Sequence, residues 1–293
     1  MRFSMSAAWN DAMALMRGNR EVLAIVAGVF FLLPGLVMAV MFAEEQAQMM
    51  AVLQQMVQGQ VLQEQPDLAL QAAPGWFLAV GLASFFIQLI GYLALLALMD
   101  DRRRPTVGEA IGTAFKCLLP LIGAVIVFAV GYVVCAMVVG LVLTMLFAGL
   151  GAATGSVAAT GLLGVIAAIA LIAAVFWVMV RLSLTLAEIV LGDNMNPIAA
   201  FAGSWRLTKG NSFRLFLFYL LLTIVYLVIN LVVFSVLMGA ISVALSGTTG
   251  GLVVGVVSGL IGAVFGVIWT AIVAAVYRQL SGPSPQAVSE AFE

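Results

Sequence analysis

Residues 213–245 of this 293-residue chain read FRLFLFYLLLTIVYLVINLVVFSVLMGAISVAL, and this stretch decides the fold. Its one charged residue, Arg214, stands near its start. About 20 consecutive apolar residues, each advancing an α-helix by about 1.5 Å, are enough to cross the hydrocarbon core of a bilayer. The stretch therefore predicts a membrane-spanning helix.

Five further apolar runs of spanning length accompany it, and the composition of the whole chain agrees with them. The chain is 64% hydrophobic and only 9% charged, with a mean hydropathy of +1.20. A soluble domain of this length does not have that balance. We therefore predict an all-α integral membrane protein with six transmembrane helices. The predicted spans are 22–43, 76–99, 120–147, 161–187, 213–245 and 252–277.

The basic residues predict which end of each span lies in the cytoplasm. If the spans alternate in direction, all 12 lysines and arginines fall on one side. The loops of the opposite side, 44–75, 148–160 and 246–251, contain none. Because cytoplasmic loops carry an excess of Lys and Arg, we expect a multi-pass protein of the bacterial inner membrane with both termini in the cytoplasm.

A short amphipathic segment precedes each pair of spans. Apolar residues recur at helical spacing over residues 5–16 and 107–118, and a third set begins in the same way at Ile198. This spacing is typical of one apolar face of an α-helix. The pattern predicts three repeats of an amphipathic interface helix plus a transmembrane hairpin; the alternative is chance amphipathicity. The repeats, about 1–100, 101–192 and 193–280, would form a single six-span membrane domain over residues 1–280.

Start and stop signals frame these amphipathic segments. Ser4 suits an N-cap, Thr106 with Glu109 suits a capping box, and Asn196 before Pro197 suits a cap followed by a first-turn proline. Gly and Asn commonly end helices. The stop signals are Arg17-Gly18-Asn19 for the first segment and Lys209-Gly210-Asn211 for the third.

Two segments lie outside the repeats. Residues 44–75 are rich in Gln and acidic residues but keep helical amphipathicity, so we expect an extracytoplasmic amphipathic loop that covers span ends, with a partner-binding surface as the alternative. Residues 281–293 are expected to form a flexible cytoplasmic tail.

Polar and small residues within the spans suggest how the helices pack. Glycines three or four residues apart, from Gly251 to Gly266, predict a packing seam in the last span. Gln88 and Asn230 are expected to hydrogen-bond across helices, with substrate contact as the alternative. Pro34-Gly35 predicts a kink in the first span, or a broken helix that lines a cavity.

Several kinds of chemistry have no residues to support them. The chain has no His, no Gly-rich phosphate loop and no nucleophile elbow, and its two Cys do not suggest a zinc site. We therefore expect no catalytic residues, no metal, no cofactor and no enzymatic activity. A basic patch suited to nucleic acid is also absent from the sequence.

The densest cluster of polar residues lies at the cytoplasmic end of the fourth span and continues into the third amphipathic segment. One interpretation is a site for an anionic headgroup or a protein partner. The other is ordinary snorkelling and pairing of charges at a membrane edge. The candidate residues are Arg181, Glu188, Trp205, Arg206, Lys209, Asn211 and Arg214.

The same region carries a family resemblance. The residues Arg181-Leu-Ser-Leu, Asp193, Asn196-Pro197, Ala199 and the string Gly203-Ser-Trp-Arg-Leu-Thr-Lys-Gly-Asn211 resemble the hallmark of a bacterial group. It comprises the membrane domain fused to some glycerophosphoryl diester phosphodiesterases and related stand-alone multi-span proteins of uncharacterised role. The chain departs from the group at Ala187, Glu188 and Gly192. The phosphodiesterase activity belongs to a separate soluble domain that needs His, so the resemblance implies the membrane part without the enzyme.

Together these features predict a non-enzymatic inner-membrane protein that engages lipid, or else a protein partner, at its cytoplasmic face. The alternative is a small-molecule or lipid transporter with a path between the repeats. A polar cavity near the midplane that contains Gln88 or Asn230 would favour the transporter. The sequence does not specify the oligomeric state.

Overall fold

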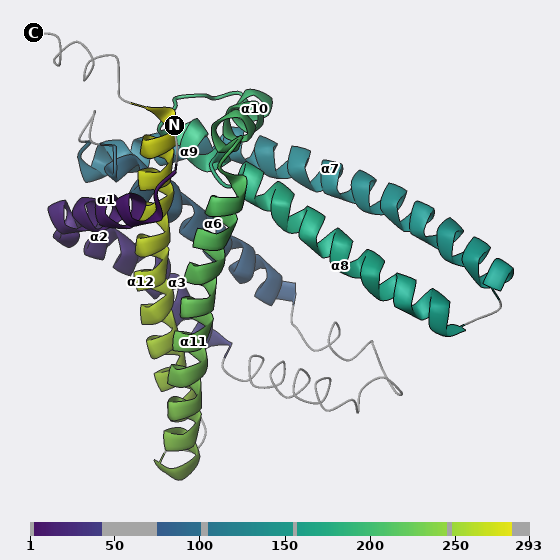
Figure 1. Ribbon diagram of the computed structural model, residues 1–293. Helices are drawn as coiled ribbons and strands as arrows, with labels where there is room; N and C mark the ends of the chain where they lie inside the picture. The colour runs from purple at the N-terminus through teal and green to yellow at the C-terminus, as the bar shows by residue number, and fades with distance from the viewer. Residues whose placement is uncertain (1–2, 43–74, 101–104, 155–156, 245–247, 283–293) are drawn as a thin grey trace, which may run out of the picture. The chain divides into compact units, whose positions relative to one another are not determined.

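The computed structural model describes residues 3–42, 75–100, 105–154, 157–244 and 248–282 (Figure 1). Every element in these ranges is helical, which confirms the predicted all-α class. The predicted loop 44–75 and tail 281–293 fall almost entirely outside the described residues. In chain order the elements are α1 (Met5–Gly18), α2 (Arg20–Ala27), the π-helix η1 (Gly28–Leu32), α3 (Leu33–Met41), α6 (Gly75–Leu98), α7 (Val107–Thr154), α8 (Val157–Leu182), α9 (Thr185–Val190), α10 (Pro197–Thr208), α11 (Ser212–Ala244) and α12 (Thr248–Ser281).

Six stretches of helix within the described residues are long and apolar enough to cross a membrane. Each overlaps one of the predicted spans, so the predicted number of six is confirmed. The chain is therefore a multi-pass membrane protein by the length and composition of its helices. The six stretches are Arg20–Met41, Ala79–Leu98, Val107–Val142, Ala173–Val190, Ser212–Val236 and Gly255–Ser281.

The predicted helix starts are confirmed. The Ser4 hydroxyl accepts from the Ala7 N–H at 3.4 Å. In the capping box, the Thr106 N–H donates to Glu109 Oε2 at 2.8 Å and the Glu109 N–H donates back to Thr106 Oγ1 at 3.4 Å. The Asn196 side chain accepts from two N–H groups of the first turn of α10. Each bond satisfies a backbone donor that a helix start leaves without an intrahelical partner.

The second repeat departs from the expected pattern. The chain breaks at Asn19 between α1 and α2, and at Gly210, whose φ is +86°, between α10 and α11. In contrast, α7 runs without interruption from its amphipathic first turns into the span that follows. The expectation of a separate interface helix is therefore wrong for this repeat. No Gly-Asn stop follows Lys116, and the missing N–H of Pro120 does not end the helix.

The chain divides into two compact units. The first comprises Met1–Ala8, Phe115–Leu220 and Val273–Glu293, and the second comprises Trp9–Ala114 and Leu221–Ile272. In the first unit, α10 packs on α9 and on α8. In the second, η1 and its neighbours α2 and α3 pack on α6.

The kink of the first span is a turn of π-helix in the second unit. Pro34 lacks an N–H, and in an α-helix its ring would clash with the carbonyl of Phe30. The wider π-turn η1 lies directly before it and accommodates the proline. A Cβ at Gly91 of α6 would overlap the Phe30 side chain, and a Cβ at Gly266 of α12 would lie 3.3 Å from the Phe31 ring. The π-turn is thus packed on these glycines, which favours the kink over a cavity-lining break.

The glycine seam of α12 lies inside the second unit. A Cβ at Gly255 would overlap that of Ala39, and a Cβ at Gly259 would lie 3.1 Å from Leu32 Cδ1. A Cβ at Gly262 would meet nothing within 4 Å. The predicted close approach is therefore made by some of these glycines, against η1 and α3, and it does not extend to Gly262.

Candidate functional site

All seven candidate residues belong to the first unit, where α10 lies beside the end of α8 (Figure 1). The last carbonyls of a helix have no intrahelical partner. The Ser204 hydroxyl of α10 donates to the Arg181 carbonyl at 2.7 Å and accepts from the Leu184 N–H at 3.2 Å. Thr208 Oγ1 also reaches the Arg181 carbonyl, at 3.4 Å. Ser204 and Thr208, which belong to the quoted string, thus fasten α10 to the end of α8.

The side chain of Arg181 is held by α10 and by its own helix. Its Nη1 donates to the Trp205 carbonyl at 3.1 Å. Its guanidinium carbon lies 5.0 Å from the ring centroids of both Trp177 and Trp205, and the two rings meet edge to face with centroids 5.1 Å apart. A cation over an indole ring is attracted by the ring quadrupole. Two aromatic faces and a carbonyl therefore accept a charge that would be costly in hydrocarbon.

Trp177 is a site residue that the sequence analysis missed. It stands four residues before Arg181, so both side chains share a helical face. The spacing is visible in the sequence, but Trp177 lies inside an apolar run and reads there as one more apolar residue of the span. The Nε atom of Arg181 is buried and has no hydrogen-bond partner in the structure.

Glu188 of α9 lies against α10. A Cβ at Gly203 would lie 2.5 Å from Glu188 Oε1, so the glycine makes room for the carboxylate. Among the described residues, no ion pair joins this carboxylate to Arg181. The two residues share a face in sequence, but the structure does not bring their charges together.

Asn211 and Arg214 hold the N-terminal segment. Asn211 is buried, and its Oδ1 accepts from the Phe3 N–H at 3.0 Å. Arg214 Nη1 donates to the Phe3 carbonyl at 3.4 Å. Gln279 of α12 pairs in the same way with Ser4, accepting from its N–H at 3.3 Å and donating to its carbonyl at 3.4 Å. In the structure, Asn211 and Arg214 therefore hydrogen-bond to the protein's own backbone at Phe3.

Two candidate basic side chains remain exposed. Arg206 stands in the last turn of α10 and Lys209 caps the helix end. Neither side chain has a hydrogen bond or ion pair with a described residue. They follow Trp205 in the chain, and the Trp205 side chain is 38% exposed. Trp205, Arg206 and Lys209 are hereafter called the basic edge of α10.

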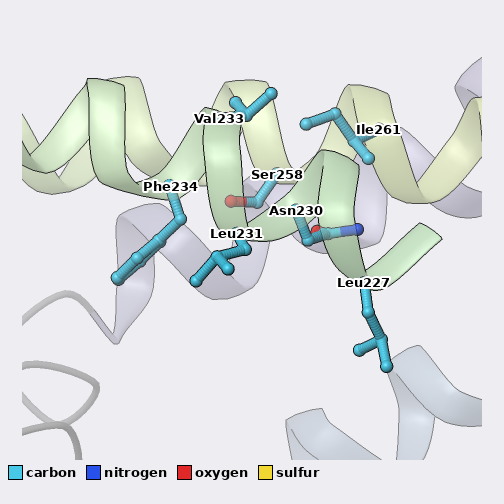
Figure 2. Close-up of a pocket in the computed structure, with 7 residues that line it drawn as sticks. All are labelled: Leu227, Asn230, Leu231, Val233, Phe234, Ser258 and Ile261. Carbon is cyan, nitrogen blue, oxygen red and sulfur yellow. The ribbon is translucent and has the colours of Figure 1, made fainter. Parts of the chain in front are cut away.

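Asn230 and Gln88 were expected to hydrogen-bond across helices, and the structure shows no such bond between described residues. Asn230 Nδ2 donates to the Tyr226 carbonyl of its own helix at 2.9 Å, and no described hydrogen bond joins Asn230 to another helix. It lines a cavity of about 320 Å³ between α11 and α12 in the second unit (Figure 2). Gln88 is exposed and is not part of this lining. The other lining residues are Leu227, Leu231, Val233, Phe234, Ser258 and Ile261.

Within the described ranges, no three His, Cys, Asp or Glu side chains come together in a way that could hold a metal ion.

Another cavity, of about 380 Å³, lies in the first unit between α7 and α8. Its lining is almost entirely apolar, with Tyr132 and Cys135 among its residues. This composition suits a hydrocarbon chain rather than a polar reactant.

Comparison with known proteins gives one family. A family model described as "Domain of unknown function (DUF7847)" matches residues 20–280. No curated protein matches the chain. No solved structure matches it either. The resemblance to the phosphodiesterase membrane domain stays a prediction, because this match does not bear on it.

Proposed function

Since this chain belongs to the DUF7847 family, whose function is unknown, we propose a role from its own geometry: a non-enzymatic membrane module that binds anionic lipid headgroups at the basic edge of α10. The observation that carries the proposal is the exposure of Arg206 and Lys209 close to Trp205, whose side chain is itself partly exposed. Each basic residue near an anionic leaflet contributes about 1 kcal/mol of attraction. An indole ring is suited to the headgroup depth.

Three other candidate residues already have partners within the protein, which leaves Arg206 and Lys209 as the basic residues for a ligand. Arg181 is held between two indole rings, and Asn211 and Arg214 contact the backbone of Phe3. These residues fix α10 and the start of α11, whereas Arg206 and Lys209 are available to a ligand. A phosphate suits them, because guanidinium and ammonium groups donate charge-assisted hydrogen bonds to its oxygens.

Native mass spectrometry of the purified protein tests the proposal. The protein is released from nanodiscs that contain phosphatidylglycerol and phosphatidylcholine in equal amounts. We expect the wild type to retain phosphatidylglycerol preferentially. The double variant Arg206→Ala/Lys209→Ala should lose about 2 kcal/mol of attraction for phosphatidylglycerol, which corresponds to a roughly 30-fold weaker affinity for that lipid. Its thermal unfolding should be unchanged.

A charge-matched control separates a site from overall charge. Arg17→Ala/Arg20→Ala also removes two exposed basic residues, at the junction of α1 and α2. The proposal expects a clearly smaller loss of bound lipid from this variant than from Arg206→Ala/Lys209→Ala. Equal losses in both double variants would show that net charge alone governs retention and would contradict a site on α10.

The orientation of the protein belongs to the same proposal. The basic edge can meet the anionic cytoplasmic leaflet only if α10 lies on that side of a bacterial inner membrane. Reporter fusions at residues 60 and 155 should then read extracytoplasmic, and fusions at 104, 194 and 290 cytoplasmic. A cytoplasmic result at residue 60 would overturn the orientation.

A transporter is the second candidate, because a cavity lined by Gln88 or Asn230 is what the transport hypothesis expects, and Asn230 lines this one. A lipid-scrambling assay in proteoliposomes with fluorescent phospholipids separates the two roles. If the protein only binds headgroups, lipid scrambling in the proteoliposomes should be as slow as in liposomes without protein. Accelerated scrambling that Asn230→Leu abolishes would favour transport instead.

A further inference from the structure

The cavity between α11 and α12 brings together two polar side chains that have unused hydrogen-bonding capacity. One N–H of Asn230 Nδ2 donates to the Tyr226 carbonyl, and this leaves Oδ1 and the second N–H available for other hydrogen bonds. Ser258 lines the same cavity from α12, and no hydrogen bond joins its hydroxyl to a described residue. Figure 2 shows both side chains at the centre of the lining, with the apolar side chains around them.

The surroundings make these free groups significant. Asn230 lies 18 residues beyond Ser212, about 27 Å along α11, within an apolar stretch long enough to span a membrane. Polar groups in hydrocarbon are costly unless they are paired. No hydrogen bond to another described residue pairs the Asn230 Oδ1 or the Ser258 hydroxyl, so both are available to a ligand or to water.

The lining also defines the chemistry of a ligand. The cavity has no charged residue, so it selects a neutral group. Leu227 and Leu231 are more than half exposed, so the cavity opens sideways, toward the acyl chains of a surrounding bilayer. A hydroxyl can both donate and accept, so it can donate to Asn230 Oδ1 and can also accept from the second Asn230 N–H or from the Ser258 hydroxyl. A carbonyl only accepts, and it would leave Asn230 Oδ1 without a donor.

We propose that this cavity binds the hydroxyl group of a neutral lipid alcohol, with the lipid's hydrocarbon chain lying along Leu227, Leu231 and Phe234. The volume of about 320 Å³ is at the lower end of the range for ligand sites, which suits a small headgroup rather than a whole lipid. This site is separate from the basic edge of α10, and either proposal can fail without the other.

Photolabelling of the full chain in phosphatidylcholine nanodiscs tests the proposal. The probe is a long-chain alcohol with a diazirine in its chain, and a matched probe carries a methyl ether in place of the hydroxyl. We expect the alcohol to label peptides from α11 and α12 about three- to tenfold more than the ether does. Competition with unlabelled diacylglycerol and, separately, with polyprenol identifies the source of the hydroxyl.

Variants assign the labelling to the two polar groups. Asn230→Leu and Ser258→Ala should each reduce it about three- to tenfold, without a change in thermal unfolding. Ser235→Ala is the matched control, because that exposed hydroxyl bonds to the Leu231 carbonyl and is outside the lining. Equal labelling by alcohol and ether, or unchanged labelling in both lining variants, would show an apolar gap and overturn the proposal.

Discussion

Arg181 donates a hydrogen bond to the carbonyl of Trp205 at 3.1 Å, and its guanidinium carbon lies 5.0 Å from the centroid of that residue's ring. One tryptophan thus contacts the cation through both its backbone and its side chain. The contact joins α8 to the last turn of α10, and it orients the helix end that carries Arg206 and Lys209. The contact that accepts the charge of Arg181 therefore also positions the proposed lipid site.

The pairing of Arg181 with Trp177 should be measurable as a coupling energy. A double-mutant cycle with Arg181→Leu and Trp177→Leu, followed by thermal unfolding in detergent, should give about 0.5–2 kcal/mol. The control cycle combines Trp177→Leu with Arg214→Leu, which have no described contact, and should be additive within about 0.5 kcal/mol. Additivity in the first cycle would mean that the two side chains only lie near each other.

Ser204 should be the most sensitive hydroxyl of α10. Ser204→Ala leaves the Leu184 N–H without its partner and removes the shortest bond to the Arg181 carbonyl. We expect a loss of about 1–3 kcal/mol in the free energy of unfolding. The exposed Ser6 provides the control, and Ser6→Ala should stay within about 0.5 kcal/mol of the wild type. A loss no larger at Ser204 than at Ser6 would contradict a structural role for the string.

Asn211 should control the order of the N-terminal segment. Asn211→Ala removes the acceptor of the buried Phe3 N–H, so hydrogen–deuterium exchange over residues 3–8 should become faster. Lipid retention at the basic edge should stay the same, because Asn211 is assigned to the protein's own backbone. Asn10→Ala, an exposed position on α1, should leave exchange unchanged. Loss of bound lipid without faster exchange would return Asn211 to the lipid site.

The glycine seam should tolerate an added methyl group at one position and not at another. Gly255→Ala forces a Cβ onto that of Ala39 and should cost about 1–3 kcal/mol. Gly262→Ala meets nothing within 4 Å and should be neutral or stabilising by up to about 1 kcal/mol, because alanine favours helix. Thermal unfolding of the two variants checks the difference, and equal effects would contradict the packing of α12 on α3.

The sequence predicted the features that depend on local chemistry. Span number follows from apolar run length, and the capping box of Thr106 and Glu109 depends on residues three positions apart. The second interface helix was predicted wrongly, because amphipathic spacing does not tell whether a helix ends before the next span. The absence of a Gly-Asn stop after Lys116 was the available signal.

Side-chain partners depend on tertiary packing and were harder to predict. Asn211 and Arg214 read as ligand groups because they stand beside Lys209, but their partner, Phe3, is more than 200 residues away in sequence. Asn230 was expected to bond across helices, and instead it bonds to the carbonyl one turn earlier in α11. That local bond is open to short polar side chains such as Ser, Thr and Asn, so sequence alone could not exclude it.

The most direct test of lipid binding at the basic edge is photocrosslinking from position 209 in native membranes, with a photoreactive amino acid in place of Lys209. The account predicts adducts with anionic phospholipids, enriched over their share of the membrane and over adducts formed from position 235, which is exposed on α11. Adducts in proportion to lipid abundance, or a single protein adduct at position 209, would contradict it.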